Sequence, residues 1–338
     1  MGQPQTLARG ARVLGSVICG LLALLSLGWI VRDLFEAAWP GQVWWMWAGT
    51  PSGYSGNGIW VTSLTDPVLL VICATAALRV PRSASAASAL FAAGTAALVL
   101  RMPSVWMLNQ DWIRLWGEGE LRTEAQISAV TTVVLGAALL ATAAIGRRPT
   151  GDPAPEHGAG TLPADGVRVP GRPRNVAAFC AALLLAVTAG ILAAREVYDA
   201  RDYGWTAYRN ILLGSRNTTL SLLNTPHGWW MAALVLLALV AAGAALARAT
   251  FSRALGLVTA GMVAAWGVLE LSVAIKFHQF DAAVDAGLRY RLTLASTVYY
   301  LLAGVTVLVL LAPQRPGHGR DPADSWGTPS YGVPPTPS

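Results

Sequence analysis

Eight apolar runs, each long enough to cross a lipid bilayer as a helix, constrain this chain more than any other feature. A hydrocarbon core of about 30 Å requires about 20 helical residues. Only 12% of the 338 residues are charged, whereas soluble globular proteins carry about 25%. The runs cover residues 13–31, 59–80, 86–102, 127–145, 176–194, 229–249, 254–275 and 294–311. The sequence therefore predicts an all-α polytopic integral membrane protein with eight transmembrane helices.

An internal repeat divides these spans into two groups of four. The segment 32–37 (RDLFEA) follows the first span, and the similar segment 195–200 (REVYDA) follows the fifth. Further matched pairs, each separated by 169 positions, are Trp60 and Trp229, Arg79 and Arg248, Ser83 and Ser252, and Gln110 and Gln279. Because each group has four spans, the groups share one orientation. We therefore expect two tandem four-helix repeats, at 1–146 and 176–312.

Two segments outside the repeats are rich in proline and poor in apolar residues. They are 147–175, which is also rich in glycine and arginine, and the C-terminal 313–338. Such compositions bury too little apolar surface to fold alone. We expect a disordered linker between the repeats and a disordered tail after them.

The positions of the arginines predict the orientation of the chain. The short turns after spans two and six each carry two arginines and no acid, at 79–82 and 248–253. Basic turns stay on the cytoplasmic side, so the N-terminus, the linker and the C-terminus are all predicted to be cytoplasmic. The first apolar run is longer than that of a signal peptide and is expected to stay as a helix. Lys276 is the one lysine among 24 basic residues, a bias typical of GC-rich bacterial genomes, so we expect a bacterial cell membrane.

Three charged residues fall within the predicted spans: Asp66, Arg101 and Glu270. Burial of a charge in a bilayer costs several kcal/mol unless a partner or water compensates. Arg101 and Glu270 occupy equivalent positions of the two repeats, which suggests an ion pair between them. The alternatives are a proton or ion relay, an Arg101 side chain that reaches the membrane surface, and an Asp66 that caps span two before Pro67.

Most of the 14 tryptophans lie in, or next to, the connections on the predicted outer face. Tryptophan commonly anchors helices at the membrane interface, but consecutive tryptophans cannot all face lipid. The residues singled out for this reason are Trp44, Trp45, Trp47, Trp112 and Trp116. They are predicted either to line a groove for a sugar, a lipid headgroup or a peptide, or to pack the loops on themselves.

Other chemistry has little support in the sequence. Cys19, Cys73 and Cys180 each lie within an apolar run and are too far apart for a disulfide framework or a zinc site. His227 and His278 stand on separate loops without the spacing of a metal site. The chain has no nucleophile elbow, P-loop or dinucleotide-binding motif. We expect no metal and no cofactor, and the scattered basic residues do not predict nucleic-acid binding.

These observations favour a non-enzymatic membrane protein that binds an envelope lipid, a glycan or a membrane protein partner through its tryptophan-rich outer loops. A secondary transporter that uses Asp66, Arg101 and Glu270 is the alternative. A membrane enzyme that acts on a lipid-linked substrate is a third possibility, and it would require a catalytic acid.

Overall fold

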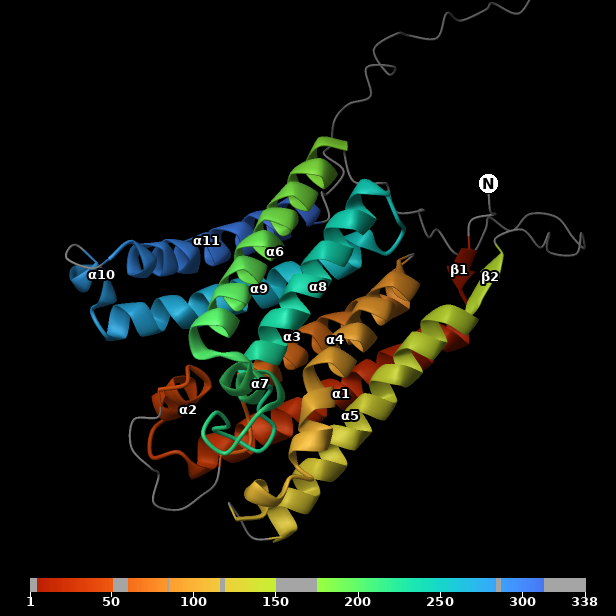
Figure 1. Ribbon diagram of the computed structural model, residues 1–338. Helices are drawn as coiled ribbons and strands as arrows, with labels where there is room; N and C mark the ends of the chain where they lie inside the picture. Colours follow the sequence, from red (N-terminus) through yellow and green to blue (C-terminus); the bar gives the residue numbers. More distant parts are fainter. Residues whose placement is uncertain are drawn as a thin grey trace, which may run out of the picture.

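The computed structural model describes residues 5–50, 60–83, 85–115, 119–149, 175–283 and 287–312. These residues form an all-helical bundle, apart from one pair of three-residue strands (Figure 1). The first half of the chain contains β1 (Gln5–Leu7), α1 (Arg9–Glu36), α2 (Pro40–Trp47), α3 (Thr65–Arg79), η1 (Val80–Arg82), α4 (Ala86–Met107), η2 (Asp111–Leu115), α5 (Gly119–Ile145) and β2 (Arg147–Pro149). The second half contains α6 (Asn175–Tyr203), α7 (Trp205–Leu213), α8 (His227–Leu246), α9 (Ser252–Lys276), α10 (Gln279–Ala282) and α11 (Leu288–Leu311).

Seven of these helices are long and apolar enough to cross a membrane: α1, α4, α5, α6, α8, α9 and α11. Their outward side chains include Leu24, Leu236 and Val309, which are 64%, 63% and 69% exposed. Large apolar side chains on the outside of every long helix suit a bundle surrounded by lipid, because water would oppose their exposure. The chain is a multi-pass membrane protein.

The predicted span at 59–80 is not one continuous helix. The helix α3 begins only at Thr65 and has 15 residues, which corresponds to about 22 Å of length. The 3-10 turn η1 continues it for three residues, or about 6 Å. Residues 60–64, which precede α3, are not helical. Hydropathy predicted the wrong helix start because apolar residues that precede Asp66 and Pro67 are equally compatible with an extended strand.

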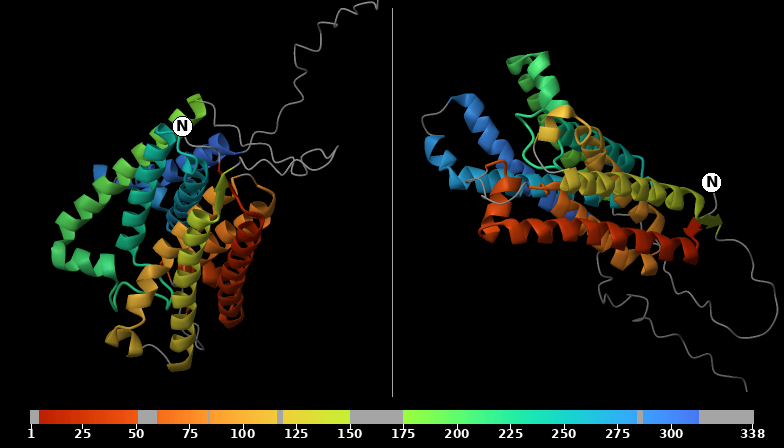
Figure 2. Two further views of the ribbon diagram at one scale, coloured as in Figure 1. Left: turned by 90° about the vertical axis from the view of Figure 1, so that its right-hand side faces the viewer. Right: turned by 90° about the horizontal axis from the view of Figure 1, so that it is seen from below.

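The long helices pack in pairs. In the first half α1 packs on α3 and α4 packs on α5, and in the second half α6 packs on α8 and α9 packs on α11. The red-to-yellow helices and the green-to-blue helices form two groups that lie side by side (Figures 1 and 2). The groups meet mainly where α4 contacts α9.

Glycines allow the tightest of these helix pairs to approach. A Cβ atom at Gly94 of α4 would lie 2.8 Å from the carbonyl oxygen of Gly136 on α5. In the second half, a Cβ atom at Gly304 of α11 would lie 2.7 Å from the backbone nitrogen of Ala264 on α9. Small residues at such crossings bring backbones into van der Waals contact, which is a main source of helix association in lipid.

The short strands β1 and β2 pair antiparallel, with Gln5 opposite Pro149 and Leu7 opposite Arg147. This ribbon joins the beginning of α1 to the end of α5. At the opposite end of the bundle lie α2, η2, α7 and α10, which connect successive long helices. We call this the α2 end, and the candidate site lies there.

Candidate functional site

Two non-helical segments meet between the halves at the α2 end. Residues 60–64 lead into α3, and residues 214–226 lead into α8. The N–H of Leu222 donates to the carbonyl of Trp60 at 3.0 Å, and the N–H of Leu223 donates to the carbonyl of Val61 at 2.9 Å. Non-helical backbone at membrane depth is stable only where protein surrounds it and supplies hydrogen-bond partners. Val61 and Leu223 are fully buried, so the surrounding helices must supply the remaining partners.

Asp33, near the end of α1, supplies the partners for the first segment. Its carboxylate is fully buried and accepts hydrogen bonds from the backbone N–H of Thr62 at 2.7 Å, the Thr62 hydroxyl at 2.6 Å and the backbone N–H of Val61 at 3.2 Å. Arg32 balances its charge, with an Nη1 to Oδ1 distance of 2.8 Å. Asp33 therefore attaches the extended segment to α1.

Asp66 and Arg101 form a buried ion pair beside these segments. Asp66, in the first turn of α3, also accepts the backbone N–H of Ser63 at 2.9 Å, so it orders the helix start as well. The Arg101 guanidinium of α4 also donates to the carbonyl of Leu223 at 2.9 Å. The pair therefore joins α3 to α4, and Arg101 links them to the second half through Leu223.

The expected pair between Arg101 and Glu270 is not formed among the described residues. Arg101 pairs instead with Asp66, because α3 presents this carboxylate next to α4 in the same half. Glu270 on α9 is half-buried and lies within the electrostatic influence of Arg195 on α6. Equivalent positions in the two repeats were not sufficient to predict the partner of Arg101.

A cavity of about 270 Å³ lies beside the two segments. Three tryptophans contribute to its wall: Trp47 from α2, Trp230 from α8 and Trp266 from α9. The ring of Trp266 lies 6.4 Å from that of Trp230 and 5.3 Å from the imidazole of His227, between ring centres. Aromatic faces from three helices therefore surround one small space.

Polar groups complete the wall of this cavity. They belong to Thr62, Ser63, Thr65, Thr218, Ser221, Asn224 and Thr225, together with His227 and Glu270. The indole N–H groups of Trp230 and Trp266 are buried and have no hydrogen-bond partner among the described residues. Hydroxyls, an amide and a carboxylate next to aromatic faces suit a small ligand that has both polar and apolar surfaces.

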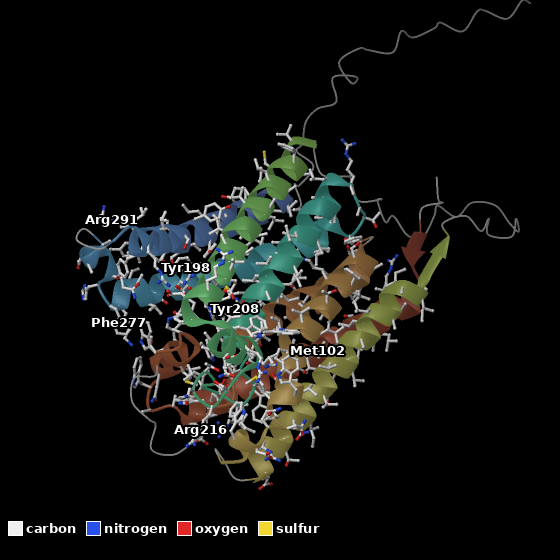
Figure 3. The ribbon with its side chains drawn as sticks, viewed as in Figure 1. Met102, Tyr198, Tyr208, Arg216, Phe277 and Arg291 are labelled. Carbon is white, nitrogen blue, oxygen red and sulfur yellow. The ribbon has the colours of Figure 1, made fainter. Side chains whose placement is uncertain are left out.

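Arg195 connects the cavity to the repeated motif of the sequence. Its charge acts on Glu270, on His227 and on the hydroxyl of Tyr300 in α11. The next residue, Glu196, is buried and accepts a hydrogen bond from the Tyr208 hydroxyl of α7 at 2.8 Å; Tyr208 is labelled in Figure 3. Burial and this hydrogen bond raise the pKa of Tyr208. In both halves the acid of the motif is thus buried: Asp33 accepts hydrogen bonds from the segment that precedes α3, and Glu196 accepts one from α7, the helix that follows α6.

Of the five tryptophans singled out in the sequence, the structure describes four, and among these four only Trp47 lines the cavity at the α2 end. Trp47 lines the cavity and donates to the Thr62 hydroxyl at 2.9 Å. Trp44 donates to Ser272 of α9 at 3.2 Å, and the ammonium group of Lys276 lies 3.8 Å from the ring centre of Trp45.

Trp112 packs against a separate cluster of buried residues that includes Val61 and Leu223. Trp116 lies outside the described residues. Two of the tryptophans of α2 therefore dock this helix on α9, across the halves, while the third contributes to the cavity.

Sequence reasoning missed four residues of this region: Asp33, His227, Trp230 and Trp266. Asp33 could have been recognised from the repeated motif, because it occupies the position that Glu196 occupies in the second copy. In the sequence Trp230 is typical of an interface anchor, and Trp266 is typical of a residue within a span. Neither position in the sequence reveals which side of its helix faces the cavity.

Within the described ranges, no group of three or more His, Cys, Asp or Glu side chains is placed to hold a metal ion. No protein-family model, curated protein or solved structure matches the chain.

Proposed function

We propose that this chain is a membrane protein that binds the hydroxyl-rich part of an envelope component, a glycan or lipid headgroup, in the cavity at the α2 end. One observation carries the proposal: Trp47, Trp230 and Trp266 share a 270 Å³ cavity with hydroxyl side chains and Glu270. Aromatic faces pack against the C–H faces of a sugar or polyol, while hydroxyls and a carboxylate hydrogen-bond its oxygens. The volume suits a single small group.

We further propose that the chain consists of two tandem four-helix repeats, at 1–146 and 176–312, with eight spans. The equivalent pairing of α1 with α3 and α6 with α8, and of α4 with α5 and α9 with α11, supports this. With η1, α3 approaches the length of a hydrocarbon core. The positive-inside rule then places both termini in the cytoplasm, so the cavity faces the outside of the cell membrane.

Calorimetric titration of the detergent-purified full chain tests the binding proposal. We expect saturable binding of a hydroxyl-rich probe, methyl glucoside or inositol, and no binding of the apolar analogue cyclohexane methanol. Trp266→Ala should weaken binding at least about tenfold, which corresponds to about 1.4 kcal/mol. The matched control is Trp205→Ala, because Trp205 is 67% exposed on α7 and outside the cavity lining. Equal effects of the two substitutions would contradict the proposal.

A secondary transporter is the second candidate function. Non-helical backbone next to a polar site at a repeat interface is typical of transporters, and the non-helical residues 60–64 and 214–226 lie beside Asp66 and Arg101. Proteoliposome uptake of the same probes distinguishes the two functions. Uptake that Glu270→Gln abolishes would favour transport, whereas binding without uptake would favour the binding function.

A further inference from the structure

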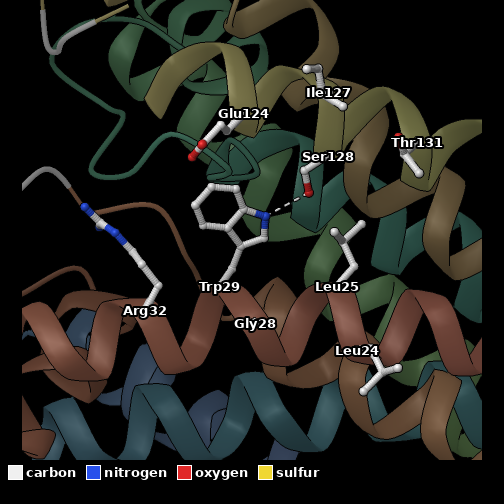
Figure 4. A pocket seen from close by; sticks show the side chains of 9 residues that line it. All are labelled: Leu24, Leu25, Gly28, Trp29, Arg32, Glu124, Ile127, Ser128 and Thr131. Atoms are coloured by element: carbon white, nitrogen blue, oxygen red, sulfur yellow. Dashed lines mark hydrogen bonds between the residues drawn. The ribbon is translucent and has the colours of Figure 1, made fainter. Parts of the chain in front are cut away.

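A second hollow, of about 470 Å³, lies between α1 and α5 and is separate from the cavity at the α2 end (Figure 4). On α1 its wall includes Leu24, Gly28 and Arg32, which are spaced four residues apart, next to Leu25 and Trp29. This spacing places them along one face of the helix. We call this hollow the α1–α5 groove.

The α5 residues of the groove also lie along one face of their helix. Glu124, Ile127 and Thr131 are spaced three and four residues apart and so share one helix face. Trp29 of α1 donates to the Ser128 hydroxyl of α5 at 2.9 Å and bridges the two helices (Figure 4). The groove therefore runs between a row of side chains on α1 and a row of side chains on α5.

The groove opens to the apolar outside of the bundle. Leu24 is 64% exposed and Ile127 is 62% exposed, and a Cβ atom at Gly28 would meet no atom within 4 Å. Eight residues separate Leu24 from Arg32, which corresponds to about 12 Å along the helix. The apolar part of the groove is therefore long enough to hold a segment of an acyl chain.

Opposite charges lie at one end of the groove. Arg32 comes from the last two turns of α1, and Glu124 from the first two turns of α5 (Figure 4). The Arg32 guanidinium binds Asp33 through Nη1, and its planar fork carries five N–H donors. A guanidinium is a strong partner for a phosphate, and a carboxylate is a strong partner for an ammonium group.

We propose that the α1–α5 groove binds a zwitterionic phospholipid of the surrounding bilayer, of the phosphatidylethanolamine type. The phosphate interacts with Arg32 and the ammonium group with Glu124. One acyl chain lies against Leu24, Gly28 and Ile127. The order of groups along the groove, charged at one end and apolar below, matches the order of groups in such a lipid.

Native mass spectrometry of the delipidated full chain in detergent tests this proposal with defined lipids. We expect phosphatidylethanolamine to bind more tightly than phosphatidylglycerol. Gly28→Leu fills the groove and should weaken phosphatidylethanolamine binding at least about tenfold. Gly190→Leu is the matched control, because Gly190 lies on α6 and also has open space at its Cβ position. Equal effects of the two substitutions would overturn the proposal.

Two further variants separate loss of the site from loss of the fold. Thr131→Trp fills the groove from α5 and should reproduce the effect of Gly28→Leu. Glu124→Gln removes the partner of the ammonium group and should abolish the preference for phosphatidylethanolamine over phosphatidylglycerol. A wild-type protein that binds both lipids equally would overturn the assignment of the headgroup. The cavity at the α2 end is not altered by these substitutions, so probe binding there should be unchanged.

Discussion

Asp33 and Thr62 are joined by two hydrogen bonds, one from the Thr62 backbone N–H at 2.7 Å and one from its hydroxyl at 2.6 Å. The two residues come from different elements, since Asp33 lies in the last turn of α1 and Thr62 lies in the segment that precedes α3. One buried carboxylate thus supplies the acceptor that allows this backbone to be non-helical inside the bundle. The wall of the cavity at the α2 end includes Thr62 and so depends on this attachment.

Asp33→Ala is therefore expected to destabilise the protein strongly. The substitution leaves the N–H groups of Val61 and Thr62 and the Thr62 hydroxyl without their acceptor, and each unsatisfied buried group costs about 1–3 kcal/mol. Thermal unfolding in detergent, followed by size-exclusion chromatography of the remaining folded protein, measures the loss. As a control, Asp281→Ala should have little effect, because the Asp281 side chain is 82% exposed. A melting temperature of Asp33→Ala equal to that of wild type would refute the role of this carboxylate.

The Asp66–Arg101 pair is expected to behave as a unit. Arg101→Leu should lower the free energy of unfolding by about 3–5 kcal/mol, because it leaves an uncompensated carboxylate in a buried site. The double variant that combines Arg101→Leu with Asp66→Asn should recover part of this loss, because it buries no unpaired charge. A double-mutant cycle measured by unfolding in denaturing detergent tests the coupling. Strictly additive losses would show that the two residues do not act together.

Tyr208 is expected to remain protonated at a pH at which exposed tyrosines ionise. Its pKa is raised above the ordinary value of about 10 by burial and by its hydrogen bond to Glu196. A raised pKa favours the neutral phenol in the folded protein. The contribution of Tyr208 to stability is therefore complete below about pH 10 and is lost as the pH rises through the folded pKa.

Comparison of wild type with Tyr208→Phe over a pH series measures this contribution. We expect the difference in melting temperature to be constant from about pH 7 to pH 9 and to decrease above about pH 10. Absorbance of tyrosinate in the two proteins identifies the ionisation of Tyr208 directly. A stability difference that changes near neutral pH would contradict the assigned cause.

Alanine substitutions of glycine should have different effects at two places in the bundle. Gly94→Ala places a Cβ atom 2.8 Å from the Gly136 carbonyl oxygen, so it should separate α4 from α5 at a cost of about 1–3 kcal/mol. Gly190→Ala adds a Cβ atom where nothing lies within 4 Å, so the greater helix propensity of alanine should leave stability unchanged or slightly higher. Melting temperatures of the two variants test the difference. Equal shifts would indicate that the α4–α5 crossing does not depend on close backbone contact.

Positions of the long helices followed from the sequence to a large extent, whereas the candidate site did not. The apolar runs at 254–275 and 86–102 predicted α9 and most of α4, because a helix lets a run of about 20 apolar residues satisfy its backbone hydrogen bonds within itself in a bilayer. The run at 59–80 was equally apolar but only partly helical. Hydropathy describes side chains, and it contains no information about a carboxylate on another helix that can accept backbone N–H groups.

The sequence by itself determined that this chain is a bundle of membrane-spanning helices, and it identified Asp66, Arg101 and Glu270 as charges within that bundle. Only the tertiary structure decided that Arg101 pairs with Asp66, and that Trp47 rather than Trp44 or Trp45 lines the cavity. The physical reason is that contacts between side chains depend on direction, whereas burial in lipid does not. Burial in lipid depends on the hydropathy of a segment, which the sequence contains, whereas an ion pair or a cavity wall depends on the rotation of each helix about its axis, which packing against the other helices sets.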